Sequence, residues 1–238
     1  MRILPILFNT DMVRAILEGR KTATRRVIKP EQLSGVGCMQ CPNNTPKEFL
    51  KVRDSMFEPY RSMLDRELIG TIYKPRYEKD DILYVRETWA WEPCWDCGMD
   101  TEEGGCDYEY ERVYNQKKKE YGCYCYRASM SDGEELSVDT WHPSIHMPKV
   151  AARIWLKVTD VRSECLQDID GKEVLKEGLN SLVHPKADYF NMNQREMFED
   201  LWNSTIKKSD IERYGWDANP WVWVIEFERC EKPEGWCV

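Results

Sequence analysis

The chain has 238 residues, enough for one large domain or for a small domain that carries insertions. It holds 34 basic and 42 acidic side chains, and the resulting net charge of −8 argues against a protein that coats nucleic acid over a long footprint. Ten Trp and twelve Tyr supply buriable area, so disorder of the whole chain is not expected. No apolar run approaches the roughly 18 residues of a membrane helix, and residues 1–8 are too short for a signal-peptide core. We therefore expect a cytoplasmic protein with no membrane partner.

The first thirty residues combine a strand, a helix and a basic segment. Residues 3–8 form an apolar strand pattern, and Asn9 or Thr10 can cap the helix that follows. Gly19 stands where a helix commonly ends in the left-handed region. The basic segment at residues 20–26 follows this helix end directly. Its arginines are candidate contacts to a substrate or to RNA phosphates, namely Arg20, Arg25 and Arg26.

The rest of the chain shows separated strand patterns and few helical ones. The predicted strands are apolar or alternating runs at residues 82–85, 108–114, 124–126, 151–161 and 221–225. The predicted helices cover about 170–177 and a stretch that starts at the capping box of residues 193–196. Strands without repeating βαβ units favour an α+β fold with a barrel-like sheet. No glycine-rich loop of the Walker or dinucleotide type is present, so nucleotide hydrolysis and hydride transfer have no support.

Lys21, Thr24 and Glu87 form the candidate catalytic set. Lys21 and Thr24 are three residues apart, so in a helical turn or a tight loop their side chains share a face. A threonine hydroxyl becomes a nucleophile when a base takes its proton, and a lysine serves as that base when burial or cationic neighbours lower its pKa. Glu87 follows the strand at 82–85, where an apolar wall would raise its pKa and favour acid catalysis. The same residues also fit a solvated basic turn and a structural carboxylate paired with an arginine.

The ten cysteines require an explanation of their own, because a reducing compartment favours free thiols or metal ligands over disulfides. Two pairs, at residues 38–41 and 94–97, have the CxxC spacing of a zinc knuckle. We expect one structural zinc, and the candidate ligands are Cys94, Cys97, Cys106 and Cys123. Two half-sites, another site within 94–125, or ordinary reduced thiols remain as alternatives.

Tryptophans are the candidate stacking residues. Trp89 and Trp141 each lie beside polar residues and a turn, which suits a ring that stacks a nucleobase. The alternative is core packing, and we favour it for the run at 221–225 because that stretch is almost continuously apolar.

Four blocks of the sequence, which together cover roughly half of the chain, follow one another in an order typical of a known family. They read ILFNTDMVRAILEGRKTATRRVIKP, DDILYVRETWA, WHPSIHMPKVAARIWLKVTDVRSECLQDI and WDANPWVWVIEFE. In these blocks the chain resembles the ASCH (activating-signal-cointegrator homology) domain, in the long form common in bacteriophage genomes. The resemblance implies one PUA-like domain over residues 1–238, a partly open β-barrel flanked by helices. The extra sequence would form insertions at about 31–80 and 91–140.

One bacterial branch of that family consists of N4-acetylcytidine amidohydrolases. In that branch a lysine accepts a proton, a threonine attacks the amide and a glutamate donates a proton, and Lys21, Thr24 and Glu87 occupy the matching positions. The resemblance thus implies hydrolysis of an acylated nucleoside without a required cofactor. Those hydrolases are about half this length, so the insertions can cap the cleft, change the substrate or abolish hydrolysis.

Two other functions compete with the hydrolase. A non-catalytic module of phage or bacterial origin would hold single-stranded RNA through the basic segment and a stacked tryptophan. An RNA nuclease ranks third, because the sequence lacks a metal-binding carboxylate cluster and a pair of histidines at ligand spacing. The expected partner is accordingly a modified nucleoside or single-stranded RNA.

Overall fold

The fold is known from a computed structural model, which describes most of the two ends of the chain and parts of its middle. The described residues are 1–28, 52–53, 56–57, 75–93, 113–116, 119–130, 140–179 and 194–234. They form a mixed α+β structure with a five-stranded sheet, a three-stranded sheet and a separate two-stranded pair, β3 (Val52–Arg53) with β4 (Met56–Phe57). The predicted α+β class is therefore confirmed.

The five-stranded sheet joins both ends of the chain. Its order is β1-β5-β9-β10-β2, with β1 parallel to β5 and every other neighbouring pair antiparallel. The strand bounds are β1 Ile3–Leu7, β2 Ala23–Val27, β5 Ile82–Arg86, β9 Trp155–Cys165 and β10 Trp221–Cys230. The strands predicted near residue 3 and near residue 221 thus lie in one sheet.

The first helix, α1 (Thr10–Leu17), begins and ends where the sequence indicates. The Asn9 side chain accepts a hydrogen bond from the Met12 backbone N–H at 2.9 Å, which caps the helix start. Gly19 has φ of +75°, a conformation that costs glycine little and other residues much more. The helix packs Val13 and Ile16 against the apolar side of the main sheet.

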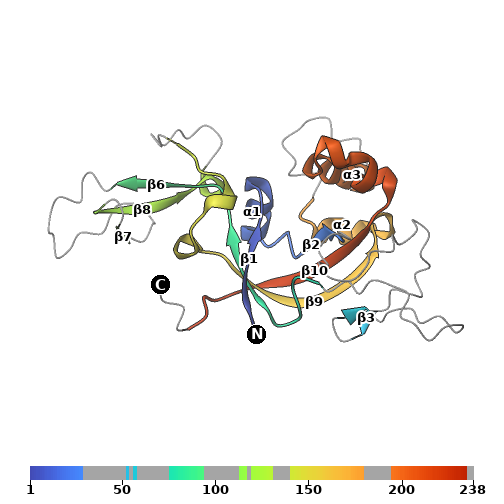
Figure 1. Ribbon diagram of the computed structural model, residues 1–238, viewed down its shortest axis with the longest axis horizontal. Helices are drawn as coiled ribbons and strands as arrows, with labels where there is room; N and C mark the ends of the chain where they lie inside the picture. Colours follow the sequence, from blue (N-terminus) through green and yellow to red (C-terminus); the bar gives the residue numbers. More distant parts are fainter. Residues whose placement is uncertain are drawn as a thin grey trace, which may run out of the picture.

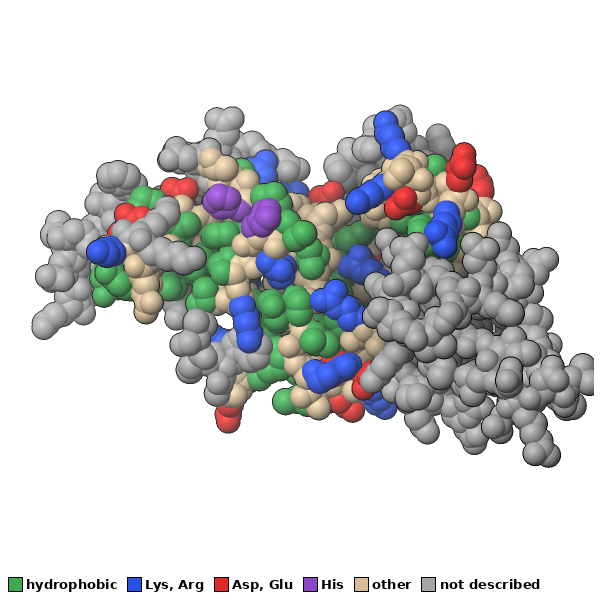
Figure 2. All heavy atoms as spheres, viewed as in Figure 1, with side chains coloured by type: hydrophobic (Ala, Val, Ile, Leu, Met, Phe, Trp, Pro, Cys, Tyr) green, Lys and Arg blue, Asp and Glu red, His purple; other side chains and the backbone are tan. Residues whose placement is uncertain are grey.

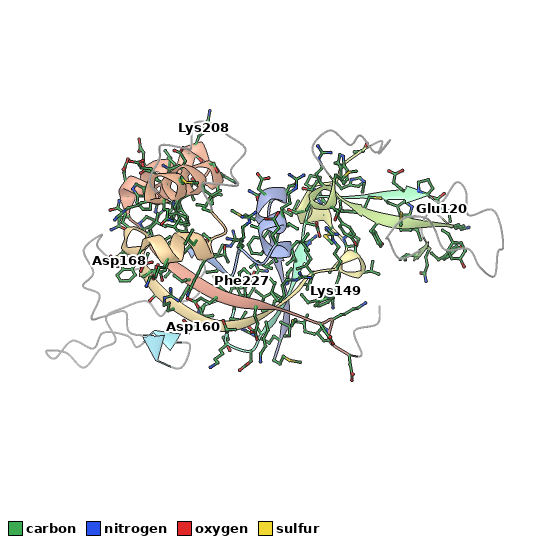
Figure 3. All side chains as sticks on the ribbon, turned by 180° about the vertical axis from the view of Figure 1, so that it is seen from behind. Glu120, Lys149, Asp160, Asp168, Lys208 and Phe227 are labelled. Atoms are coloured by element: carbon green, nitrogen blue, oxygen red, sulfur yellow. The ribbon has the colours of Figure 1, made fainter. Side chains whose placement is uncertain are left out.

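Helices cover the other face of the same sheet at the β10–β2 edge. They are α2 (Gly171–Lys176), α3 (Gln194–Thr205) and the short α4 (Ile211–Tyr214). Successive side chains of β10 alternate between the two cores: Ile225 packs with α1, and Val224 packs with α2 and α3. The prediction of a central strand buried on both faces is confirmed. Seen from behind, Phe227 of β10 lies near the centre of the molecule (Figure 3).

The second sheet contains β6 (Trp89–Pro93), β7 (Val113–Asn115) and β8 (Glu120–Tyr126), in the order β6-β8-β7. β7 and β8 pair with each other and overlap the strands predicted at 108–114 and 124–126, although they begin and end at different residues. Figure 1 shows α1 between this sheet on one side and α2 with α3 on the other.

The two outer strands of the main sheet, β1 and β2, approach one another. Arg26 of β2 donates a hydrogen bond from Nη2 to the Leu7 carbonyl of β1 at 2.8 Å. No backbone ladder joins these two strands within the described segments, so the sheet is curved but the barrel is not closed. Much of the expected insertions at 31–80 and 91–140 lies outside the described residues. None of the helices seen in the described segments is long and apolar enough to cross a membrane.

Candidate functional site

The segment that carries Lys21 and Thr24 is extended, which corrects the predicted helical turn or tight loop. The backbone N–H of Lys21 bonds to Ala15 at the end of α1, and the N–H of Thr22 donates to Lys176 at 2.8 Å. Lys21 also forms an isolated antiparallel bridge with Glu177. These backbone groups pair with the end of α2 and then with β10, so no further helical turn forms.

Lys21 is enclosed completely, with a side-chain exposure of 0%. Its Nζ donates to the Glu177 carboxylate at 2.7 Å and to the Glu177 backbone carbonyl at 3.0 Å. The same ammonium lies 5.7 Å from the centre of the Phe8 ring. Burial lowers the pKa of Lys21, the Glu177 carboxylate opposes that shift, and the charges of Arg26 and Arg25 reinforce it.

Thr24 is buried on the same side of the sheet as Phe8. It pairs across β2 and β10 with Ile225, whose side chain belongs to the core that includes Phe8. Residues opposite each other on antiparallel strands share a face, and so do residues two apart on one strand. Thr24 and Arg26 therefore face the Phe8 side together. Within the described segments the Thr24 hydroxyl has no hydrogen-bond partner.

Arg25 faces the opposite side of β2 and lies inside an ion-pair network. Its guanidinium contacts Glu164 at 2.6 Å, Glu173 at 2.8 Å and Glu177 at 3.1 Å, with a side-chain exposure of 1%. Three carboxylates of the described chain thus contact Arg25, and its enclosed side chain differs in this respect from the half-buried Arg26. Arg20 donates hydrogen bonds to the Glu18 carboxylate and to the backbone carbonyl of Gly178, the residue after Glu177.

Glu87 follows β5 directly, where the sequence analysis expected it, and is 1% exposed. Its two carboxylate oxygens accept hydrogen bonds from Nε and Nη2 of Arg153, each at 3.0 Å. Burial raises the pKa of Glu87, while the hydrogen bonds and charge of Arg153 act in the opposite direction. Arg153 also lies over the Tyr126 ring at 3.9 Å.

The surroundings of Lys21 and of Glu87 are distinct. No contact joins the Lys21 ammonium to the Glu87 carboxylate within the described residues, and their ion-pair partners differ. The two positions are linked through β1, because the Phe8 backbone N–H donates to the Arg86 carbonyl at 3.2 Å, one residue before Glu87. The register of β2 with β10 places Thr24 on the Phe8 side, and the Lys21 ammonium reaches that side 5.7 Å from the Phe8 ring centre, although Lys21 itself lies outside β2. Glu87 follows Arg86, the residue whose carbonyl the Phe8 N–H contacts.

The two candidate stacking tryptophans pack against other rings. Trp89 in β6 lies 4.9 Å from the His142 ring and 5.7 Å from the Tyr124 ring. Trp141 packs beside the second sheet, with the Arg127 guanidinium 5.6 Å from its ring centre. Both residues are half-buried and stabilise the three-stranded sheet and the chain beside it.

The predicted zinc ligands fall mostly outside the described residues. Cys94, Cys97 and Cys106 belong to stretches that the structure leaves undescribed. Cys123 is buried in β8 with its Sγ 3.9 Å from the Sγ of Cys125. In the portions of the chain that are described, no group of three metal-ligating side chains occurs. The structural zinc stays a prediction.

Sequence reasoning missed Glu177, the carboxylate that holds Lys21, and Arg153, which holds Glu87. Glu177 stands 156 residues away from Lys21, and its position before a helix-ending glycine signals only a helix terminus. Comparisons of the chain with protein-family models, with curated proteins and with solved structures found no match.

Proposed function

We propose that this protein is an amidohydrolase of the ASCH type, with a PUA-like fold, that removes an acyl group from a modified nucleoside such as N4-acetylcytidine. The observation that carries the proposal is the buried Lys21, whose pKa is lowered and whose ammonium lies 5.7 Å from the Phe8 ring, on the side of the sheet that Thr24 faces. A lysine of lowered pKa accepts a proton more readily than an exposed lysine, and a hydroxyl that loses its proton can attack a carbonyl.

The reaction divides into two steps. Lys21 accepts the hydroxyl proton as Thr24 Oγ1 attacks the acyl carbonyl, and the C–N bond breaks as the exocyclic amine of the base takes a proton from Glu87. The acyl group is then an ester on Thr24. Glu87 takes a proton from the water that attacks this ester, Lys21 returns its proton to Thr24 Oγ1 as the C–O bond breaks, and the carboxylic acid is released. No metal or cofactor is needed for these steps.

Two ion pairs influence the protonation states of Lys21 and Glu87 in this scheme. Glu177 stabilises the ammonium form of Lys21 and so opposes burial, which favours the neutral amine. Arg153 likewise stabilises the carboxylate of Glu87 against burial. A substrate that enters between them changes the solvation of both groups, and Glu87 must hold its proton against Arg153 to act as the acid.

The test uses the full-length protein and measures the hydrolysis of N4-acetylcytidine to cytidine and acetate. Chromatography separates the substrate from the products. Thr24→Val removes the nucleophile and keeps the side-chain shape, so it should abolish turnover. Thr22→Val is the matched control, because Thr22 is on the same segment and only half-buried. Lys21→Met and Glu87→Gln should each lower the rate by about 10²–10⁴-fold.

Two results would refute the proposal that the protein is a hydrolase. One is an inactive wild-type protein on a panel of acylated nucleosides, and the other is full activity of Thr24→Val. Inactivity together with RNA binding that Arg26→Gln abolishes would favour the non-catalytic RNA-binding module instead.

A further inference from the structure

Two side chains from other parts of the chain donate hydrogen bonds to backbone carbonyls of β1. Arg26 donates to the Leu7 carbonyl at 2.8 Å, and the Tyr77 hydroxyl donates to the Pro5 carbonyl at 2.7 Å. The Arg76 guanidinium lies 5.5 Å from the centre of the Tyr77 ring. Residues 76 and 77 are thereby brought beside β1, whose Leu7 carbonyl Arg26 of β2 also reaches.

Lys21, Arg26 and Arg76 form what we call the cationic cluster. The Lys21 ammonium and the Arg26 guanidinium lie 5.7 Å and 5.4 Å from the centre of the same Phe8 ring. Exposure increases along the cluster: Lys21 is buried, Arg26 is half-buried and Arg76 is exposed. The reaction proposed for Thr24 would thus take place at the buried end of the cluster. The two arginines lie at the end that is closer to solvent.

Among the described residues, carboxylates form ion pairs with the cationic cluster at its buried end and not with its two arginines. Lys21 is paired with Glu177, but within the described chain neither Arg26 nor Arg76 forms an ion pair. A guanidinium has five N–H donors, and Arg26 directs one of them to a described acceptor. Burial lowers the pKa of Arg26, Tyr77 and the Glu177 carboxylate oppose that shift, and the nearby charge of Arg76 adds to it. Two neighbouring guanidinium groups without a counter-ion favour a bound anion.

We propose that Arg26 and Arg76 bind the phosphate group of a nucleotide, so that the substrate is an acylated nucleoside monophosphate in preference to the free nucleoside. This inference rests on the proposed function for the reaction, but the phosphate site itself is a binding property. Arginine matches phosphate oxygens with paired N–H donors, and a half-buried site screens the charge less than bulk water does. The base end of the nucleotide then extends towards Thr24 and Lys21.

Calorimetric titration of the full-length protein with cytidine, cytidine 5′-monophosphate and inorganic phosphate tests the site without turnover. We expect the monophosphate to bind about tenfold or more tightly than cytidine, the factor that a hydrogen bond to a charged group supplies. Inorganic phosphate should compete with the monophosphate and not with cytidine. Arg76→Gln should remove most of the preference, and Arg26→Gln should do the same.

The matched control is Lys79→Gln, which removes one positive charge from an exposed position three residues after Arg76. It should leave the preference for the monophosphate intact. A thermal melt of each variant separates loss of the site from loss of the fold, and Arg76→Gln serves where Arg26→Gln disturbs the β1 edge.

Equal affinity for cytidine and its monophosphate would overturn the proposal, and so would a preference that survives both arginine substitutions. Affinity that rises steadily with the length of a single-stranded oligoribonucleotide would also overturn it, because it would assign the cluster to RNA. A protein that binds the monophosphate through these arginines but hydrolyses no acylated nucleotide would refute the proposed reaction and keep the phosphate site.

Discussion

Replacing Glu177 with glutamine removes the negative charge next to a fully buried ammonium. The Lys21 Nζ lies 2.7 Å from the Glu177 carboxylate, and the two side chains are 0% and 4% exposed. Glutamine keeps the shape and one acceptor oxygen, and the backbone carbonyl at 3.0 Å still accepts from Lys21. Besides the charge, one accepting oxygen is replaced by an NH2 group, so either Lys21 or Arg25 also loses its hydrogen bond to this side chain.

Breaking a buried ion pair on one side typically costs 3–5 kcal/mol, because the other charge is left without compensation. For Glu177→Gln we expect about 3 kcal/mol, the lower end, since Arg25 keeps its contacts with Glu164 and Glu173. Glu173→Gln is the matched control: Glu173 belongs to the same network, is 22% exposed and has no contact with Lys21. It should cost less than Glu177→Gln.

The cost of Glu177→Gln should depend on pH. Burial already holds the pKa of Lys21 below its ordinary value, and loss of the Glu177 carboxylate lowers that pKa further. Between the folded and unfolded pKa values of Lys21, the unfolded chain binds more protons, so stability rises with pH. That window begins at a lower pH in the variant, so the difference from wild type should shrink as pH rises through the interval between the two folded pKa values, which lies below the ordinary lysine pKa of about 10.4.

Urea unfolding followed by tryptophan fluorescence, at several pH values from 6 to 9.5, measures this difference. The expected pattern is a destabilisation of Glu177→Gln that is largest at the acidic end of this range and diminishes towards the alkaline end, with no such trend for Glu173→Gln. A cost below about 1 kcal/mol, the range of an exposed pair, would refute the reasoning, as would a cost independent of pH.

Three further predictions concern the fold and the metal. Gly178→Ala should destabilise the protein by about 1–3 kcal/mol in urea unfolding, because φ is +89° and an added Cβ would lie 2.8 Å from the Ala15 Cβ. Asn9→Ala should cost about 1 kcal/mol by the same measurement, through loss of the cap on α1, and Asn9→Ser should restore most of it. Metal analysis of protein purified without added zinc should find bound zinc; less than about 0.2 equivalents, with all thiols titrating freely, would refute the structural zinc site.

Local signals in the sequence were sufficient to predict α1 and several strands. Asn9 and Gly19 mark the two ends of α1 because capping and left-handed backbone depend on residues within one turn. The apolar runs at 82–85 and 221–225 also predicted strands correctly, because the pattern of apolar residues that marks a buried strand is visible in a few neighbouring residues. The α+β class followed from the order of these elements.

Tertiary structure alone decided which charged groups meet. Nothing near Lys21 in the sequence indicates that Glu177 is its partner, and the alternation of β2 sends Arg25 into a carboxylate network while Arg26 turns to the Phe8 side. The basic segment at 20–26 therefore reads as one feature in sequence and divides between two faces of a sheet. Ion pairs between residues more than 150 positions apart depend on how strands and helices pack, and that packing is decided by the burial of apolar side chains along the whole chain.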